Sequence, residues 1–419
     1  MSLGYKETVE EYLYPTSADI STSRIEYIEQ GSSDYHIRLG GTRLIVDAMI
    51  VKEDGTPAVD IDDVAPVDNV LHSLFNQVDV WFGDNTRVSS SSLNYGYKAY
   101  IETVLNHDMD VKKTQLTMQH FYQDNNLARP SPKSGGENEK NWGLVKRHEL
   151  CTKPNTFQMC GRVHSDVFNM TNLLLPGVKV RVRFSRSNQS FVLMTSGSEK
   201  YKIVITNAKL KLQKVRLDES FSVAQERALS VRNALYTYVR SDVKVFHIPK
   251  GQDVKKQPNL LHGVIPKRVT VGIVNTDAYN GNYQKNPYDF QKGNLVKISA
   301  TVDGLGGVTH EFTPDFDEKK YVNAYQALFQ GRSKRTGKFG NGISMDDYSN
   351  GYTLYCFDFT PCIDSEEGDH MGQLKSGNVT LHMVFDPPTT HAMTAIALCE
   401  MDGMITITKD REILTNYSL

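Results

Sequence analysis

The chain has 419 residues, of which 39% are hydrophobic, 23% charged and 10% aromatic, and its net charge at pH 7 is -2. This composition excludes disorder of the whole chain, and the length predicts two or three domains with cores of their own. A net charge so close to zero does not indicate a nucleic-acid-binding protein. The sequence contains no run of about 20 uncharged apolar residues, so we expect no membrane-spanning helix.

The N-terminal 30 residues are acidic, with two basic side chains against six acidic ones and hence a net charge of -4. Phosphate would repel such a segment, so we expect residues 1–30 to form an arm that contacts protein. The segment also lacks the apolar stretch of a signal peptide, which argues against secretion by the ordinary route.

Short strands are predicted at 25–28, 36–39 and 44–50, and the most informative local pattern follows at 65–105. Its first part is apolar and then alternates up to Phe82, before Gly83-Asp84-Asn85; this predicts a long strand that ends in a turn. After a polar serine run the apolar spacing becomes helical, which predicts a helix over Tyr95–Leu105. We expect Tyr97, Tyr100 and Ile101 of this helix to be largely buried, against their own sandwich or a neighbour.

Residues 108–141 are polar and include a segment rich in Pro and Gly, so we place a long exposed loop there. Strands are predicted again at 156–167, 178–184 and 200–215. In the middle one, basic side chains alternate with valines. A nucleic-acid contact is one interpretation of that basic face. The same alternation also occurs in any strand that has one buried face and one face in solvent, and we favour this second interpretation.

Residues 218–235 predict a helix that links two halves, because polar residues precede apolar residues at helical spacing. Strand patterns then return, at 243–248, 268–275, 294–303, 352–360, 379–385 and 393–408. Helical segments are few and short, and Gly, Pro, Asn and Asp separate the strands. The sequence therefore predicts an all-β chain of antiparallel sandwiches or barrels.

An internal repeat supports two domains of the same kind. Gly177–Phe184 resembles Gly377–Phe385, and the helix pattern at 98–105 resembles 323–329, with the same order of strand, helix, loop and three strands in both halves. We therefore divide the chain into an acidic arm, a first sandwich, a linker helix and a second sandwich, at 1–30, 31–217, 218–235 and 236–419.

No motif for catalysis or metal binding survives inspection. The segment Gly331–Lys338 has the wrong spacing for a phosphate loop, and 304–307 is glycine-rich but opens onto a strand pattern instead of a helix. The acidic turns at 60–63 and 364–370 fit no known cation loop. Five cysteines without a C-x-x-C pair are expected to be buried thiols. We therefore predict no catalytic residue, no cofactor-binding residue and no metal ligand, and do not expect an enzyme.

Several blocks resemble the double jelly-roll major capsid proteins of Maverick/Polinton elements and adintovirus-like DNA viruses. The resemblance covers nearly the whole chain and is weakest over 1–30 and 125–150. The individual blocks are not catalytic motifs, so their number and order carry the specificity. They are PVDNVLHSLFNQVDVWFGD at 66–84, YGYKAYIETVL at 95–105, VKVFHIPKG at 243–251, LLHGVIPKRVTVGIVNTDAYNGNYQKNPYDF at 260–290, DDYSNGYTLYCFDFTP at 346–361 and GNVTLHMVF at 377–385.

The resemblance implies two consecutive eight-stranded antiparallel jelly rolls with short inserted helices, and a structural protein of the virion. Such chains would form homotrimers, pseudo-hexagonal tiles of an icosahedral shell assembled inside the host cell, with penton and other minor capsid proteins as partners and no sequence-specific contact to nucleic acid. The chain is short for a virus-type member of that family. The alternative function is a β-sandwich attachment or glycan-binding protein, for which 364–370 is the candidate site.

Overall fold

The computed structural model of the chain describes residues 4–17, 19–20, 23–90, 92–133, 136, 139–153, 156–261, 263–303, 308–329, 340–360 and 376–415. Of the residues in these ranges, 41% lie in strands and 21% in helices, which confirms the predicted all-β class with short helices. Within these ranges no helix is both long enough and apolar enough to cross a bilayer.

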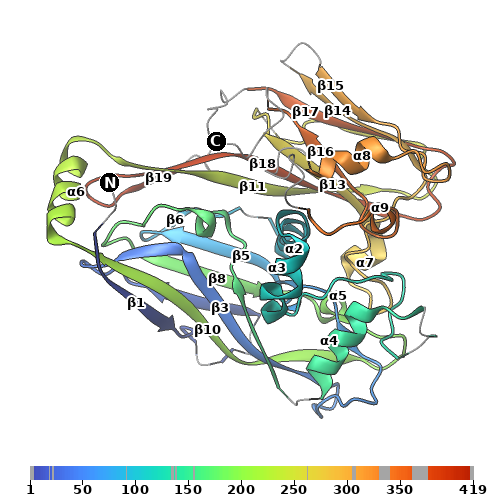
Figure 1. Cartoon of the computed structure of the whole chain (residues 1–419), viewed down its shortest axis with the longest axis horizontal. Helices are drawn as coiled ribbons and strands as arrows, with labels where there is room; N and C mark the ends of the chain where they lie inside the picture. The colour runs from blue at the N-terminus through green and yellow to red at the C-terminus, as the bar shows by residue number, and fades with distance from the viewer. Residues whose placement is uncertain are drawn as a thin grey trace.

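The first half of the chain forms a sandwich of two antiparallel sheets (Figure 1). In spatial order, one sheet holds β1 (Tyr5–Leu13), β10 (Tyr201–Leu217), β3 (His36–Lys52) and β7 (Phe157–Arg162), and the other holds β2 (Arg24–Glu29), β8 (Val180–Arg186), β5 (Phe75–Phe82) and β6 (Thr86–Arg87). A separate short ladder joins β4 (Ala65–Pro66) and β9 (Leu193–Met194). In β8 the valines and Phe184 are buried and the arginines between them half-buried, as the alternation predicts.

The second half repeats this arrangement. One sheet holds β11 (Ala234–Ile248), β18 (Met393–Ile407), β13 (Arg268–Asn275) and β16 (Leu354–Asp358), with β19 (Ile413–Thr415) paired to β18; the other holds β12 (Val254–Gln257), β17 (Asn378–Phe385), β14 (Leu295–Asp303) and β15 (Val308–Phe312). Each half thus has eight equivalent strands in chain order: β1 and β11, β2 and β12, β3 and β13, β5 and β14, β6 and β15, β7 and β16, β8 and β17, β10 and β18. Two four-stranded sheets connected in this order are a jelly roll.

Both halves carry their main helical insertion at the same place. The first insertion separates β6 from β7 and the second separates β15 from β16, which confirms the predicted order of the repeat. The first contains α2 (Tyr95–Asn106), α3 (Met109–Lys113), η1 (Gln115–Gln119) and α4 (Trp142–Thr152); the second contains α8 (Val322–Gln326), η4 (Ala327–Phe329) and α9 (Met345–Ser349). The helix predicted at 95–105 is therefore confirmed. Further short helical turns are α1 (Val70–Ser73), η3 (Asp166–Asn169), α5 (Gln189–Val192) and α7 (Thr276–Asn280).

Two predictions for the first half are wrong. The long strand expected from residue 65 is interrupted, because Asn69 takes a left-handed conformation (φ 54°) that Asn tolerates, and α1 follows it. The exposed loop expected at 108–141 contains α3 and η1, and Phe121 and Leu127 within it are buried. The polar composition of this stretch suggested an exposed loop, but some of its polar side chains point into the protein. Asp124, for example, is buried and forms an ion pair with Arg147.

The structure places the strands of residues 1–30 in the first sandwich, with β1 at the edge of one sheet and β2 at the edge of the other. A helix, α6 (Glu219–Val231), connects β10 to β11, and Asp218 caps it by accepting a hydrogen bond from the Ser220 N–H. In Figure 1, β11, β18 and β19 extend past the second sandwich and over the first, toward α6. We call residues 234–239, 402–407 and 413–415 the overhang.

Each half contributes side chains to the core of the other. Tyr236, Ile405 and Ile407 of the overhang belong to the core of the first sandwich. Conversely, Tyr100 and Val104 of α2 belong to the core of the second. The two jelly rolls therefore share a packed junction instead of being joined only through a linker.

Candidate functional site

The junction between the two jelly rolls is built on α2. The sequence predicts that Tyr97, Tyr100 and Ile101 are buried, and their exposed fractions are 2%, 0% and 0%. The helical spacing puts these side chains on one face, and the position of α2 between the sandwiches directs that face onto the second one (Figure 1). An element inserted in the first sandwich thus completes the core of the second.

Aromatic rings form the centre of this contact. Tyr100 stacks on Tyr288 of the second half with ring centroids 4.0 Å apart and an interplanar angle of 4°. Tyr97 stacks on Tyr279, also of the second half, at 5.8 Å. The Tyr288 hydroxyl lies 2.7 Å from the Ser73 hydroxyl of the first half, so the ring is also fixed by a hydrogen bond. Such rings bury large areas with defined geometry, which fixes how the two rolls sit against each other.

A fully buried charged cluster lies beside the rings. Arg147 of α4 pairs with Asp124 at 2.7 Å and with Asp68 at 3.4 Å, and the side chains of all three are 0% exposed. The Arg147 Nε–H donates to the Pro66 carbonyl at 2.9 Å. The cluster also reaches the second half, because the Asn286 amide donates to Asp124 at 3.0 Å. One guanidinium therefore joins the insertion, the chain before α1 and the second roll.

Two carboxylates share that single guanidinium. Burial raises the pKa of Asp68, and the Asp124 carboxylate adds to the rise although Arg147 opposes it. Asp68 Oδ1 accepts the N–H groups of Asn69 and Tyr122 at 2.7 and 2.8 Å. The arrangement holds these charges inside the fold, and the other oxygen of Asp68, Oδ2, is buried without a hydrogen-bond partner.

Sequence reasoning missed this cluster. Arg147 and Asp124 both lie in a stretch whose polar composition resembles a surface segment. The helix that carries Arg147 has no strong apolar periodicity, and only contacts across the fold show that its basic side chain points inward. A single sequence contains no indication of such pairing.

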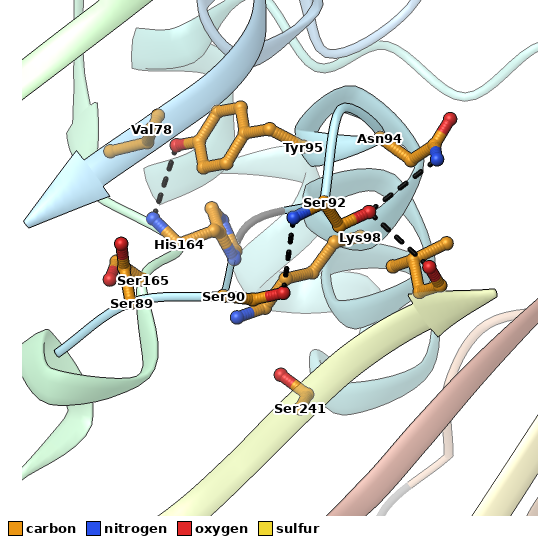
Figure 2. A pocket seen from close by; sticks show the side chains of 11 residues that line it. Val78, Ser89, Ser90, Ser92, Asn94, Tyr95, Lys98, His164, Ser165 and Ser241 are labelled. Atoms are coloured by element: carbon orange, nitrogen blue, oxygen red, sulfur yellow. Dashed lines mark hydrogen bonds between the residues drawn. The ribbon is translucent and has the colours of Figure 1, made fainter. Parts of the chain in front are cut away.

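A small cavity lies at the edge of the junction, between the start of α2 and strand β11 (Figure 2). Its volume is about 20 Å³, enough for one water molecule. Lys98 of α2 forms an ion pair with Asp166, and Asp166 accepts hydrogen bonds from the Ser241 hydroxyl and N–H at 2.6 and 2.9 Å. Ser241 belongs to β11, so this network is a second polar bridge between the rolls.

Burial and neighbouring charges shift the pKa values of His164 and Lys98, two ionisable groups that line the cavity. Burial, followed by the positive charges of Lys98 and Arg162, lowers the pKa of His164 to about 3. A base that weak takes up almost no proton near pH 7. Its Nδ1 lies 2.7 Å from the Glu102 carboxylate, which fixes the neutral ring as a donor. Burial disfavours the charged form of Lys98, but Asp166 and Glu102 outweigh it and raise the Lys98 pKa.

The acidic residues at 60–63 anchor loops. Asp62 accepts the Val59 N–H at 2.8 Å and pairs with Lys52 at 2.9 Å. Asp63 bonds to Ser131 and Ser196 and so ties this turn to two other loops. No group of three or more His, Cys, Asp or Glu side chains that could hold a metal ion occurs in the part of the chain that the structure describes.

The cysteines within the described ranges follow the predicted burial in part. Three are buried and Cys160 is half-buried. Burial raises the pKa of the Cys151 and Cys399 thiols, which makes them poor nucleophiles. The fifth, Cys362, lies outside the described residues, as do the basic segment 331–338, the glycine-rich turn 304–307 and the acidic turn 364–370.

Strands β1 and β11 hold equivalent positions but differ in what covers them. Along β11, side chains are buried at several positions, including Tyr236, Tyr238 and Ser241. Along β1 no side chain is buried, and the strand exposes 48% of Tyr5, 37% of Val9 and 45% of Tyr12. β1 is therefore a bare edge with large apolar side chains, the kind of surface that natural proteins cover.

Comparison with known proteins places the fold. No protein-family model matches the chain. The uncharacterised protein F54H12.2 of Caenorhabditis elegans is 23% identical over 377 residues, which cover 87% of this chain and 86% of that protein.

Among solved structures, a chain of the Sputnik virophage is similar with a TM-score of 0.63 and 11% identity, over 99% of this chain and 89% of that one. The mavirus major capsid protein gives a TM-score of 0.55 and 10% identity, over 100% and 92%. A chain of the PBCV-1 virus capsid gives 0.58 and 10%, over 100% and 98%. These neighbours are double jelly-roll major capsid proteins. The chain has the double jelly-roll fold.

Proposed function

We propose that this chain is a major capsid protein that forms homotrimeric, pseudo-hexagonal capsomers of an icosahedral shell. The observation that carries the proposal is the duplication: two eight-stranded jelly rolls of the same strand order, fixed rigidly to each other through α2. Two similar rolls per chain make three chains a ring of six similar units, which is the shape that packs into a hexagonal sheet. Solved capsid proteins matched over their nearly complete length support the same role.

The particle belongs, in this proposal, to a DNA virus or a virus-like transposable element of the Maverick/Polinton and adintovirus-like kind. The sequence blocks that resemble that family support this assignment, and so does a relative that is a protein of a nematode and not of a free virus. The virion is then the place where the chain acts. Penton and other minor capsid proteins are its further partners, and its contact with the genome is not sequence-specific.

The role is structural and not enzymatic. At the cavity between the rolls, His164 is too weak a base for proton transfer near neutral pH, and the volume admits only a water molecule. The guanidinium of Arg147 is fully buried and bonds to the Pro66 and Tyr122 carbonyls and to Asp124. In this proposal these two groups of polar side chains serve to hold the rolls together.

Native mass measurement of the purified chain, followed by negative-stain microscopy, tests the proposal. We expect a mass of three chains and hexagonal particles, since an obligate interface of this kind buries on the order of 2,000 Å² or more. A chain that stays monomeric at micromolar concentration would refute the capsomer.

A further inference from the structure

We infer that the bare strand β1 is the docking surface for the second jelly roll of a neighbouring copy, which covers it as the first roll covers β11 within the chain. This inference rests on the proposed capsomer and adds to it the two surfaces that meet. The argument uses the equivalence of the two rolls and the different burial of equivalent parts.

Within the chain, the contact between the rolls joins the connection between β6 and α2 to strand β11. The Ser90 hydroxyl donates to Asp242 of β11 at 2.9 Å, and the Ser92 hydroxyl donates to the Val243 carbonyl at 3.3 Å. Figure 2 shows these serines facing β11 across the cavity. The first strand of one roll is thus covered by the segment that leads into the helical insertion of the other.

The two segments that are equivalent to these contacting segments are exposed to solvent within the chain. The equivalent of β11 is β1, which has no buried side chain. The equivalent of the connection between β6 and α2 is residues 313–321 between β15 and α8, and six of its residues are exposed: Thr313, Asp315, Asp317, Glu318, Lys319 and Lys320. A chain that repeats its own internal contact between copies, second roll to first roll, covers both surfaces at once. Repetition of one head-to-tail contact closes into a ring when the rotation allows it.

The surface of β1 tolerates such covering. Its carboxylates already have partners on the chain: Glu10 pairs with Lys211 at 2.9 Å, Glu11 contacts Lys214, and Glu7 accepts the Tyr35 hydroxyl at 3.0 Å. An incoming copy therefore meets paired charges and exposed aromatic rings. Burying the rings removes apolar area from water, which stabilises the contact, while the carboxylates that already have partners limit the desolvation cost.

Substitution of one residue on each face of β1 tests the surface. We choose Val9→Glu with Tyr12→Glu, because both side chains are exposed, so the new charges remain in solvent in the monomer. The matched control places the same two charges on other exposed apolar positions, Ile61→Glu with Met118→Glu, which are 86% and 55% exposed.

Native mass and circular dichroism of the three proteins then separate the outcomes. We expect a trimer for the unchanged chain and the control, and a folded monomer for V9E/Y12E, with at least a tenfold rise in the dissociation constant. A V9E/Y12E protein that remains a trimer overturns the β1 inference and leaves the capsomer intact. An unchanged chain that is monomeric overturns the capsomer itself.

A photo-crosslinking residue at position 12 of the intact trimer identifies the partner surface directly. We expect intermolecular products that map to residues 313–321 or to other parts of the second roll. Products that join position 12 to the first roll of another copy, or only to its own chain, contradict the inference.

Discussion

The two jelly rolls share one strand order but use their insertions differently. In the first roll, the insertion is long, and its helix α2 is buried inside the junction. In the second, α8 has five residues, and the matching tyrosine, Tyr325, is only half-buried. The comparison teaches that two rolls with the same strand order differ in their insertions, and that, in the part of the chain that the structure describes, only the longer insertion supplies a helix buried in the core of the other roll.

The largest effect is expected from the charged cluster on the side of the first roll. Replacing Arg147 with Met strands the carboxylates of Asp68 and Asp124 in the interior, and breaking a buried pair in this way costs about 3–5 kcal/mol. Chemical denaturation of the whole chain measures it. The matched control is Arg129→Met, because Arg129 pairs with Glu139 on the surface, where such pairs contribute about 0–1 kcal/mol. Similar losses for both variants would show that the cluster does not hold the junction.

A smaller difference in the free energy of unfolding is expected between variants of the two equivalent tyrosines, Tyr100 and Tyr325. Tyr100→Ala empties a fully buried ring position at the junction, and we expect a loss of about 3 kcal/mol in the free energy of unfolding. Tyr325→Ala removes a half-buried ring whose hydroxyl donates to the Ile343 carbonyl at 2.9 Å, so about 1–2 kcal/mol is expected. Urea midpoints of the two variants give the comparison directly. Equal losses would mean that the two insertions contribute alike.

The buried histidines give the first roll a pH dependence. Burial lowers the pKa of His120 to about 4, with the charge of Arg147 adding to it, and burial also lowers the pKa of His72 and His164. The unfolded chain then takes up these protons first, near pH 6.5. The stability from the neutral rings is present above pH 6.5 and is lost as the pH falls toward 4, by about 2 kcal/mol each for His120 and His164 between pH 6.5 and 5.

Urea midpoints at pH 7, 6 and 5 measure this loss, and His120→Gln should reduce its slope. Asp68 acts in the opposite direction, because its raised pKa makes the folded chain bind a proton that the unfolded chain does not. Asp68→Asn should therefore steepen the acid loss. A stability that does not change between pH 7 and 5 in the Asp68→Asn variant would contradict the assignment of neutral, buried histidines.

The smallest effect is expected at the connection between the rolls. Asp218→Ala removes the cap of α6, which costs about 1 kcal/mol at a typical helix start. Most of α6 is exposed, so the loss should appear as fraying of that helix in hydrogen exchange while exchange at α2 stays unchanged. Loosening of α2 in this variant would show that the connection, and not the junction, couples the rolls.

The local patterns of the sequence were sufficient for the elements that one buried face specifies. The alternation in β8 predicted which residues are inside, and the spacing of Tyr97, Tyr100 and Ile101 predicted the buried face of α2. The repeated order of strands and helix predicted two similar sandwiches. The first two inferences need only residues that are near in the chain, because the period of the side chains reports which face is covered.

Tertiary structure alone decided the rest. The polar stretch at 108–141 looked like surface, yet Asp124 within it is buried because it pairs with Arg147, 23 positions further along the chain. The acidic residues of β1 looked like a separate arm, yet lysines of β10 pair with them at the edge of a sheet. By itself the sequence determined two similar β-sandwiches and the buried face of α2. The packing of one roll on the other determined the charged junction, because long-range pairing and burial leave no period in a single sequence.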